Sequence, residues 1–157
     1  MDKIDSNEII QIGIVVKNIE ETAKNYAELF GLPMPQIKTV RPQELTHATY
    51  RGKPMMSEAK LCSFKMGAAN IELTQPDEKD SIWKELLDTR GEGVQWLGFN
   101  MPDPKANTDM LEKKGIKVLH WGDTGKGTYS MMDTMSKLKV SLNIKGPKSE
   151  FRDEQKK

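Results

Sequence analysis

The most constraining feature of this chain is a strand-and-helix pattern that occurs twice. Residues 9–16 (IIQIGIVV) are rich in β-branched side chains, which predicts a strand. Asn18 follows at an N-cap position, and Gly31 ends a stretch with apolar side chains at helical spacing. The same order returns later, because residues 94–101 (VQWLGFNM) predict a strand and Asp103-Pro104 predicts the start of a helix. Two copies of one unit indicate a fold built from two similar halves.

A further match extends each copy to a closing strand. Residues 71–76 (IELTQP) resemble residues 142–147 (LNIKGP), and both stretches end in proline. The two closing strands lie fewer residues apart in the sequence than the two opening strands do. The first copy is therefore longer than the second, and its extra residues lie most simply within residues 33–57. A chance match is the alternative, but agreement at both ends favours a duplication. We therefore predict an α+β fold with two βαβββ repeats, about residues 9–76 and 94–147, which form an open, curved mixed β-sheet cleft with helices outside.

The repeats define the expected domain organisation. An N-terminal extension, residues 1–8, precedes a single domain at residues 9–147, and a polar tail, residues 148–157, follows it. Between the repeats, residues 81–91 predict a short connecting helix, with Ser81 as its N-cap and a glycine at its end.

Composition excludes several kinds of partner. Lys and Arg total 24 against 23 Asp and Glu, a net charge of +1, so neither a nucleic acid nor an anionic membrane is expected. The apolar run at residues 9–16 is too short to span a bilayer, and the charged N-terminus does not resemble a secretory signal. The single cysteine, Cys62, cannot form an internal disulfide, which agrees with a reducing compartment. We therefore expect a cytoplasmic protein.

Alternation of side chains along the strands divides the predicted sheet into two faces. One face is apolar and should pack against the helices. The opposite face carries four polar or aromatic side chains: Gln11, Glu72, Trp96 and Asn143. Alternation leaves two interpretations open, because this face could meet solvent or could line a cleft between the two halves.

Several stretches resemble the vicinal-oxygen-chelate superfamily, the glyoxalase and bleomycin-resistance fold. They are residues 11–31 (QIGIVVKNIEETAKNYAELFG), 67–76 (GAANIELTQP) and 81–99 (SIWKELLDTRGEGVQWLGF). Within the superfamily they are most similar to methylmalonyl-CoA epimerases and proteins related to lactoylglutathione lyase. The resemblance implies a ligand cleft on the inner face of the sheet, and it implies a homodimer.

The resemblance also implies where a metal would bind. Members of the family typically hold a divalent metal with two histidines, a carboxylate or glutamine, and a glutamate, and the metal stabilises an enolate. The matching positions here are Gln11, Glu72, Trp96 and Asn143. Only Glu72 is an ordinary ligand. The only polar group of Trp96 is an N–H, which has no lone pair to coordinate a metal. We therefore expect no metal cofactor.

Other side chains are candidates for contacts with a ligand. His47 and His120 are the only histidines, and His120 is expected at the end of a strand, residues 116–120. The glycine-rich residues 122–127 lack the spacing of a P-loop and precede a strand, so we expect a mobile loop from which Lys126 contacts the ligand, for example a CoA phosphate. Glu72 and His120 are thus the catalytic candidates. The predicted ligand cleft comprises Gln11, Glu72, Trp96, Asn143, His47 and Lys126.

Three functions follow as alternatives. The resemblance implies an epimerase, isomerase or lyase that acts on a small carbonyl acid or its thioester, and the missing metal ligands argue against it. The second alternative is a metal-free protein that binds a small molecule such as an organic acid or an acyl-CoA, with Trp96 as a stacking surface, as in bleomycin-resistance proteins. In the third, Trp96 fills the barrel and the protein has no small-molecule site.

Overall fold

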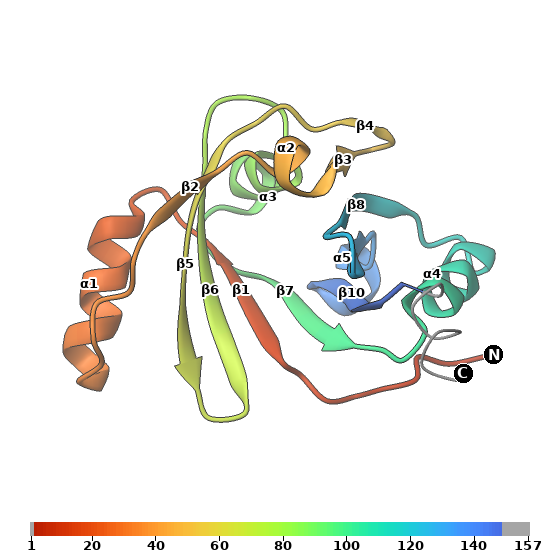
Figure 1. Ribbon diagram of the computed structural model, residues 1–157, viewed down its shortest axis with the longest axis horizontal. Helices are drawn as coiled ribbons and strands as arrows, with labels where there is room; N and C mark the ends of the chain where they lie inside the picture. Colours follow the sequence, from red (N-terminus) through yellow and green to blue (C-terminus); the bar gives the residue numbers. More distant parts are fainter. Residues whose placement is uncertain (1, 149–157) are drawn as a thin grey trace.

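Residues 2–148 are described in a computed structural model of the protein, and they form one curled sheet with helices around it (Figure 1). The first half contains β1 (Gln11–Val15), α1 (Ile19–Phe30), β2 (Lys38–Val40), β5 (Ala59–Met66) and β6 (Ala69–Pro76). The second half contains β7 (Gly93–Asn100), α4 (Pro104–Lys113), β8 (Val118–Asp123), β9 (Gly127–Met132) and β10 (Ser141–Pro147). Each half is thus a βαβββ unit, as the sequence predicts.

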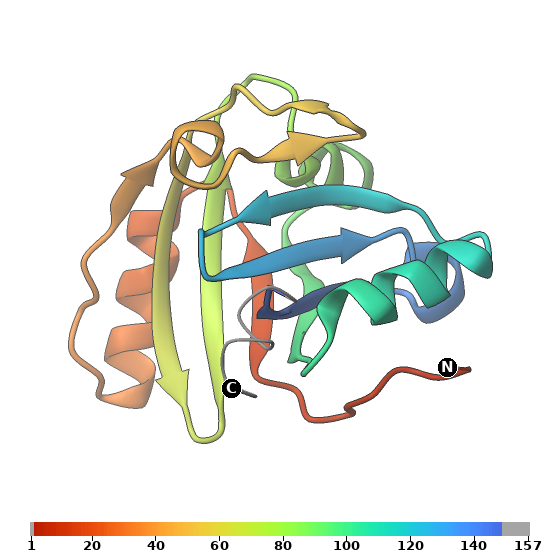
Figure 2. The same ribbon diagram turned by 45° about the vertical axis from the view of Figure 1, so that its right-hand side comes forward.

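The two halves join through their first strands. The strand order is β2-β5-β6-β1-β7-β10-β9-β8, and β3 and β4 extend the sheet beyond β8. Strands β1 and β7 pair antiparallel at the centre, whereas β1 is parallel to β6 and β7 is parallel to β10. The strands of the first half run steeply across those of the second half in Figure 2. The predicted α+β fold with an open, curved mixed sheet is confirmed.

Local capping explains where the helices begin and end. The Asn18 side chain accepts a hydrogen bond from the backbone of the first turn of α1, and Gly31 ends this helix in the left-handed conformation. Asp103 caps α4 in the same way, with proline at the first helical position. Ser81 caps the connecting helix α3 (Ile82–Arg90). These boundaries agree with the signals in the sequence.

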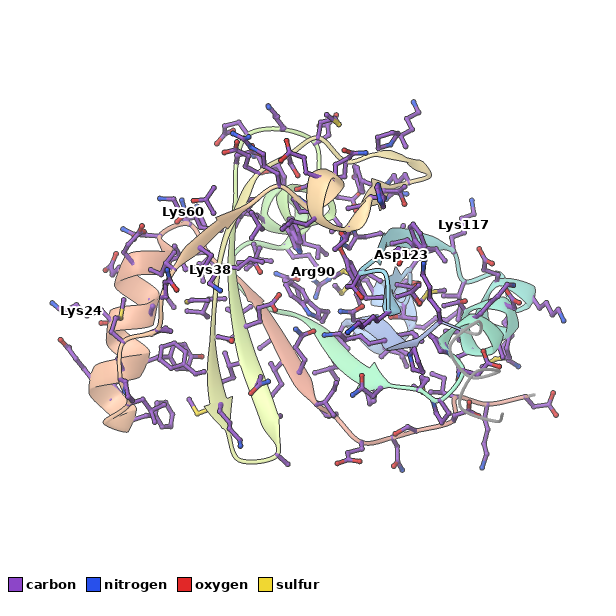
Figure 3. The ribbon with its side chains drawn as sticks, viewed as in Figure 1. Lys24, Lys38, Lys60, Arg90, Lys117 and Asp123 are labelled. Atoms are coloured by element: carbon purple, nitrogen blue, oxygen red, sulfur yellow. The ribbon has the colours of Figure 1, made fainter. Side chains whose placement is uncertain are left out.

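The apolar faces of the strands pack against the helices, which lie outside the sheet (Figure 1). In the first half Leu73 packs in a cluster with Ile19 and Ala23 of α1. In the second half, Phe99 and Ile144 pack with residues of α4. Side chains crowd the space between the two halves in Figure 3, whereas Lys24 and Lys117 point outward.

The extra residues of the first half form a small subdomain that crosses to the second half. It contains α2 (Pro42–Thr46), β3 (Thr49–Tyr50) and β4 (Lys53–Pro54). Because β3 pairs with β8, the insertion adds to the far edge of the second half's sheet. It appears in yellow above the sheet in Figures 1 and 2. The insertion thereby spans the open side of the curled sheet.

The structure differs from the sequence predictions at β8 and at the turn that follows it. The strand expected at residues 116–120 is β8, which continues to Asp123, so the prediction that His120 ends a strand is wrong. A mobile loop is expected from the sequence at residues 122–127. Gly122 instead pairs with Tyr129 within the sheet, and only residues 124–126 form a tight turn between β8 and β9. A short helix, α5 (Met135–Leu138), separates β9 from β10. The predicted polar tail lies outside the described residues, except for Lys148, which forms an ion pair with Asp123.

Within residues 2–148, no helix is long and apolar enough to cross a membrane. Cys62 is buried among the side chains beneath α1, and burial raises the pKa of its thiol to about 11. A buried thiol with a raised pKa is a poor nucleophile, so Cys62 is not a candidate catalytic residue.

Candidate functional site

The central strand pair places each large side chain of one half against a glycine of the other. Gln11 of β1 is opposite Gly98 of β7, and Gly13 of β1 is opposite Trp96 of β7. A β-carbon on Gly98 would lie 2.8 Å from Cβ of Gln11, and one on Gly13 would lie 1.8 Å from the indole ring. The two glycines therefore make room for two side chains that lie across the inner face of the sheet.

The neighbouring strands bring the other two candidate positions beside this pair. Glu72 of β6 is in register with Gly13, and Asn143 of β10 is in register with Gly98. The four positions singled out in the sequence thus come from four adjacent strands, β6, β1, β7 and β10. Paired residues point to the same side of a sheet, so all four side chains share the inner face.

Gln11 lies at the centre of a hydrogen-bond network that joins the four side chains. Its Oε1 accepts from Trp96 Nε1 at 3.1 Å and from Asn143 Nδ2 at 3.3 Å. Its Nε2 donates to Glu72 Oε2 at 3.0 Å. Because an indole can only donate and a carboxylate accepts, these partners determine the orientation of the Gln11 amide. Asn143 Oδ1 is buried and has no partner among the described residues.

The network borders a cavity of about 220 Å³ between the two halves. Its apolar wall includes Leu61, Trp83, Trp96 and Met131. Helix α2 of the insertion supplies a further side of the cavity. Trp96 is only 1% exposed, yet its ring lines the cavity and leaves this volume open beside it. The inner face of the sheet therefore lines a cavity between the two halves and is not an open, solvated face.

Glu72 is a carboxyl group in a largely apolar environment. Burial raises the pKa of its carboxyl, whereas the positive charge of Lys145 and the hydrogen bond from Gln11 act in the opposite direction. Lys145 also lines the cavity, so the lining carries one acidic and one basic side chain. A carboxyl with a raised pKa in a cavity is a candidate for binding or proton transfer.

His120 lines the cavity in a neutral form. It is 2% exposed, and burial lowers its pKa to about 4, partly offset by its hydrogen bond to Thr49. Since the partner atom is a carbonyl oxygen, 3.0 Å away, Nδ1 carries the proton and Nε2 remains an acceptor. The imidazole contacts the rings of Trp83 and Tyr129, with centroid distances of 5.4 and 5.2 Å. His120 is therefore a packed, uncharged hydrogen-bonding group.

Tyr129 connects the cavity to the helix that covers it. Its ring lies over Gly122, where a β-carbon would come within 2.2 Å of it. The Thr46 hydroxyl of α2 donates to the Pro42 carbonyl, so it accepts from the Tyr129 hydroxyl at 2.7 Å. This contact attaches α2 to β9 across the cavity. Gly122 thus provides space for a tyrosine ring.

The structure places two predicted cleft residues away from the cavity lining. His47 ends α2 in a left-handed conformation with its side chain exposed. Lys126 lies in the exposed turn between β8 and β9, beside a neighbouring surface depression that shares Tyr129 and Lys145 with the cavity lining. Gln11, Glu72, Trp96, Asn143 and His120 line the cavity together.

Several lining residues escaped the sequence analysis. Lys145 lies two residues after Asn143 on the same strand face, so alternation could have identified it. Tyr129 could have been found by the same argument applied to β9. Pro42 and Leu45 come from the insertion, for which the repeat offers no matching copy, so no signal in the sequence placed them at the cavity.

The four family positions do not form a metal site in this geometry. The Oε1 atom of Gln11 already accepts two hydrogen bonds, and Trp96 directs a donor at it. Glu72 is the only charged ligand type of the four. Within residues 2–148, no group of three His, Cys, Asp or Glu side chains is placed to hold a metal ion. The donor set fits a hydrogen-bond network and does not fit zinc, cobalt or nickel.

Residues 10–131 match the family model of the Glyoxalase/Bleomycin resistance protein/Dioxygenase superfamily. The match spans most of the chain, and the curled sheet with its duplicated halves is the fold of that family. The chain belongs to the glyoxalase/bleomycin resistance/dioxygenase superfamily. The resemblance noted in the sequence is thereby confirmed.

Solved structures similar to this chain include methylmalonyl-CoA epimerases. A complex of methylmalonyl-CoA epimerase with methylmalonyl-CoA and NH4+ is 18% identical, with a TM-score of 0.60, and the match covers 90% of this chain and 94% of that one. The epimerase from Mycobacterium tuberculosis is 16% identical, with a TM-score of 0.61 and coverage of 98% and 96%. A hypothetical protein, BH1468 from Bacillus halodurans C-125, is 15% identical, with a TM-score of 0.63 and coverage of 92% and 97%. No curated protein matches the sequence. These similarities show a shared fold.

Proposed function

We propose that this protein is a metal-independent small-molecule-binding protein of the glyoxalase superfamily. The observation that carries this proposal is the network centred on Gln11, in which the side chains at the family's metal positions bond to one another beside an open cavity. When the side chains at the metal positions bond to one another, the pocket keeps its shape but has no metal ion to act as a Lewis acid. Binding is then the activity that the remaining groups support best.

The volume of the cavity limits the size of the ligand. An apolar cavity of about 150 Å³ accommodates a benzene molecule. The cavity of about 220 Å³ therefore suits one ring, or an aliphatic group of similar size, with a short polar substituent. A larger ligand such as an acyl-CoA could place only its acyl end inside. The aromatic walls supply stacking surface, and Glu72 and Asn143 supply polar contacts.

Tryptophan fluorescence tests this proposal directly. A screen of small ring compounds should find ligands that change the emission, because Trp83 and Trp96 both line the cavity. Trp96→Ala should weaken binding of these compounds, since it removes one wall. Trp121→Phe is a matched control, because Trp121 lies next to His120 on β8 and lines a different surface depression. If Trp96→Ala bound every hit as tightly as the parent, the cavity would not be the binding site.

The second candidate function is a metal-independent isomerase or lyase that acts on a small carbonyl acid or its thioester. Glu72 favours it, because burial raises the pKa of its carboxyl, and a carboxyl with a raised pKa is a better general base. The structural similarity to methylmalonyl-CoA epimerases supports the same reaction class. In such a reaction Glu72 would remove the proton next to the carbonyl group. Without a metal to stabilise the enolate, the rate should fall by roughly a hundredfold or more.

Hydrogen exchange distinguishes the two candidates. Methylmalonyl-CoA incubated with the protein in D2O should exchange its α-proton no faster than the uncatalysed reaction if the protein only binds. Rapid exchange that Glu72→Gln abolishes would establish the isomerase function in its place. Glu58→Gln is the control, because Glu58 pairs with Arg41 at the surface and does not line the cavity.

A further inference from the structure

Three acceptor atoms on the cavity lining have no hydrogen-bond partner within residues 2–148. Asn143 Oδ1 is buried without a partner. Glu72 receives its one hydrogen bond at Oε2, which leaves Oε1 unused. His120 donates from Nδ1 to the Thr49 carbonyl, so its Nε2 accepts. A buried acceptor without a donor, as at Asn143, is unfavourable, and a ligand that donates would satisfy it and could also bond to Glu72 and His120.

The sheet register places these acceptors along one side of the cavity. Asn143 pairs with Met131, and Met131 pairs with His120, so both side chains belong to one row across β10, β9 and β8. Gln11 bonds to both Asn143 and Glu72, which extends the group to β6. Acceptors from three strands, β6, β8 and β10, therefore line one cavity.

Two donor side chains on the lining also lack hydrogen-bond partners among the described residues, and one of them, Lys145, acts on the charge of Glu72. Trp83 is on α3, and Lys145 is two residues beyond Asn143 on β10. The Lys145 side chain has no ion pair within the described residues and is half-buried. The lining thus carries one negative charge, on Glu72, and one positive charge, on Lys145, which partly offsets it.

Aromatic rings flank the same space. Trp83, Trp96 and Tyr129 line the cavity, and the uncharged His120 ring lies between Trp83 and Tyr129. The faces of indole and phenol rings attract cations, most strongly where water is excluded. Acceptors, a carboxylate and aromatic walls together describe the environment that suits an organic ammonium group.

We propose that the cavity selects small primary amines in their ammonium form. The three N–H groups of the ammonium would donate to Glu72, Asn143 and His120, and the apolar part of the ligand would pack against Trp83 and Trp96. This inference rests on the proposed binding function and adds the chemical class of the ligand. It also assigns Lys145 an opposing role, because its charge repels the ligand.

Three probes of one shape and different charge test the inference by titration calorimetry at pH 7. Benzylamine carries an ammonium group, benzyl alcohol a neutral hydroxyl, and benzoate a carboxylate. We expect benzylamine to bind about tenfold more tightly than benzyl alcohol, since a hydrogen bond to a charged group contributes more than a neutral one. Benzoate should bind most weakly of the three.

Two substitutions locate the origin of the preference. Glu72→Gln keeps the shape of the side chain and should abolish the preference for benzylamine while benzyl alcohol still binds. Lys145→Met removes the opposing charge and should increase the affinity for benzylamine. Equal binding of the amine and the alcohol, or tightest binding of benzoate, would overturn the amine inference and leave the binding function intact. If none of the three probes bound, the proposed binding function and this inference would both fail.

Discussion

The indole ring of Trp96 lies directly against the backbone of Gly13, so that a β-carbon at residue 13 would come within 1.8 Å of Trp96 Cε2. This contact joins the two halves of the molecule, because the two residues pair across the central strands β1 and β7. It also holds the indole N–H within 3.1 Å of Gln11 Oε1. The packing of one glycine thereby determines the geometry of the cavity floor.

Gly13→Ala should destabilise the protein by about 1–3 kcal/mol, because the added methyl group overlaps the indole ring. The backbone at residue 13 is not in the left-handed region, so the cost is steric. Urea unfolding measures the change. In a Trp96→Ala background the same substitution should cost much less, and an equal cost in both backgrounds would contradict the contact.

Trp96→Phe should also destabilise the protein, by about 1 kcal/mol, because Gln11 Oε1 loses its indole donor and keeps only the bond from Asn143. The phenyl ring still fits over Gly13, so this variant isolates the hydrogen bond from most of the packing. Thermal unfolding followed by circular dichroism provides the measurement. In combination with Gln11→Met, which removes the acceptor, the cost of Trp96→Phe should shrink; full additivity would show that the bond contributes nothing.

Stability should decrease as the pH falls from about 6.5 toward about 4, because His120 is neutral in the folded protein. Its folded pKa of about 4 lies below the unfolded value of 6.5. The unfolded chain therefore binds a proton first, and the free energy of unfolding decreases over this range, by roughly 3 kcal/mol.

Chemical denaturation of the parent and of His120→Gln at several pH values measures this effect. The difference in stability between the two proteins should change over the stated range. His47→Gln, at the surface, is the control for the loss of an imidazole. A parallel response of the parent and His120→Gln would exclude His120 as the source.

The purified protein should contain no stoichiometric transition metal, because Trp96 and the amides of Gln11 and Asn143 replace the family's ligands. Elemental analysis after purification without chelators checks this expectation. The triple variant Gln11→His, Trp96→His and Asn143→Glu supplies the family's ligand types and should gain affinity for zinc or cobalt. About one equivalent of metal in the parent, lost in Glu72→Ala, would overturn the prediction.

The resemblance to the superfamily leads us to propose a homodimer. Light scattering at micromolar concentration should give about twice the chain mass of 17.8 kDa. A mass equal to that of one chain across this concentration range would contradict the proposal.

Local signals in the sequence predicted most of the fold. The caps Asn18, Ser81 and Asp103 begin the three longest helices where expected, because capping depends on residues within one turn. Side-chain alternation identified Gln11, Glu72, Trp96 and Asn143 as one face of the sheet, since a period of two is a property of the strand itself. The repeat then implied that the two halves are alike.

Only the tertiary structure decided how that face is used. The register between β1 and β7 sets Gly13 against Trp96 and Gln11 within reach of Asn143, and register is a relation between distant segments that neither strand contains alone. The insertion carries α2 over the cavity because β3 pairs with β8, a contact between residues far apart in the chain. The same pairing buries His120, which the sequence placed at a strand end. Hydrophobic pattern and capping depend on neighbouring residues and can therefore be recognised in the sequence. The cavity and its hydrogen bonds arise from pairing between distant segments, which only the folded chain specifies.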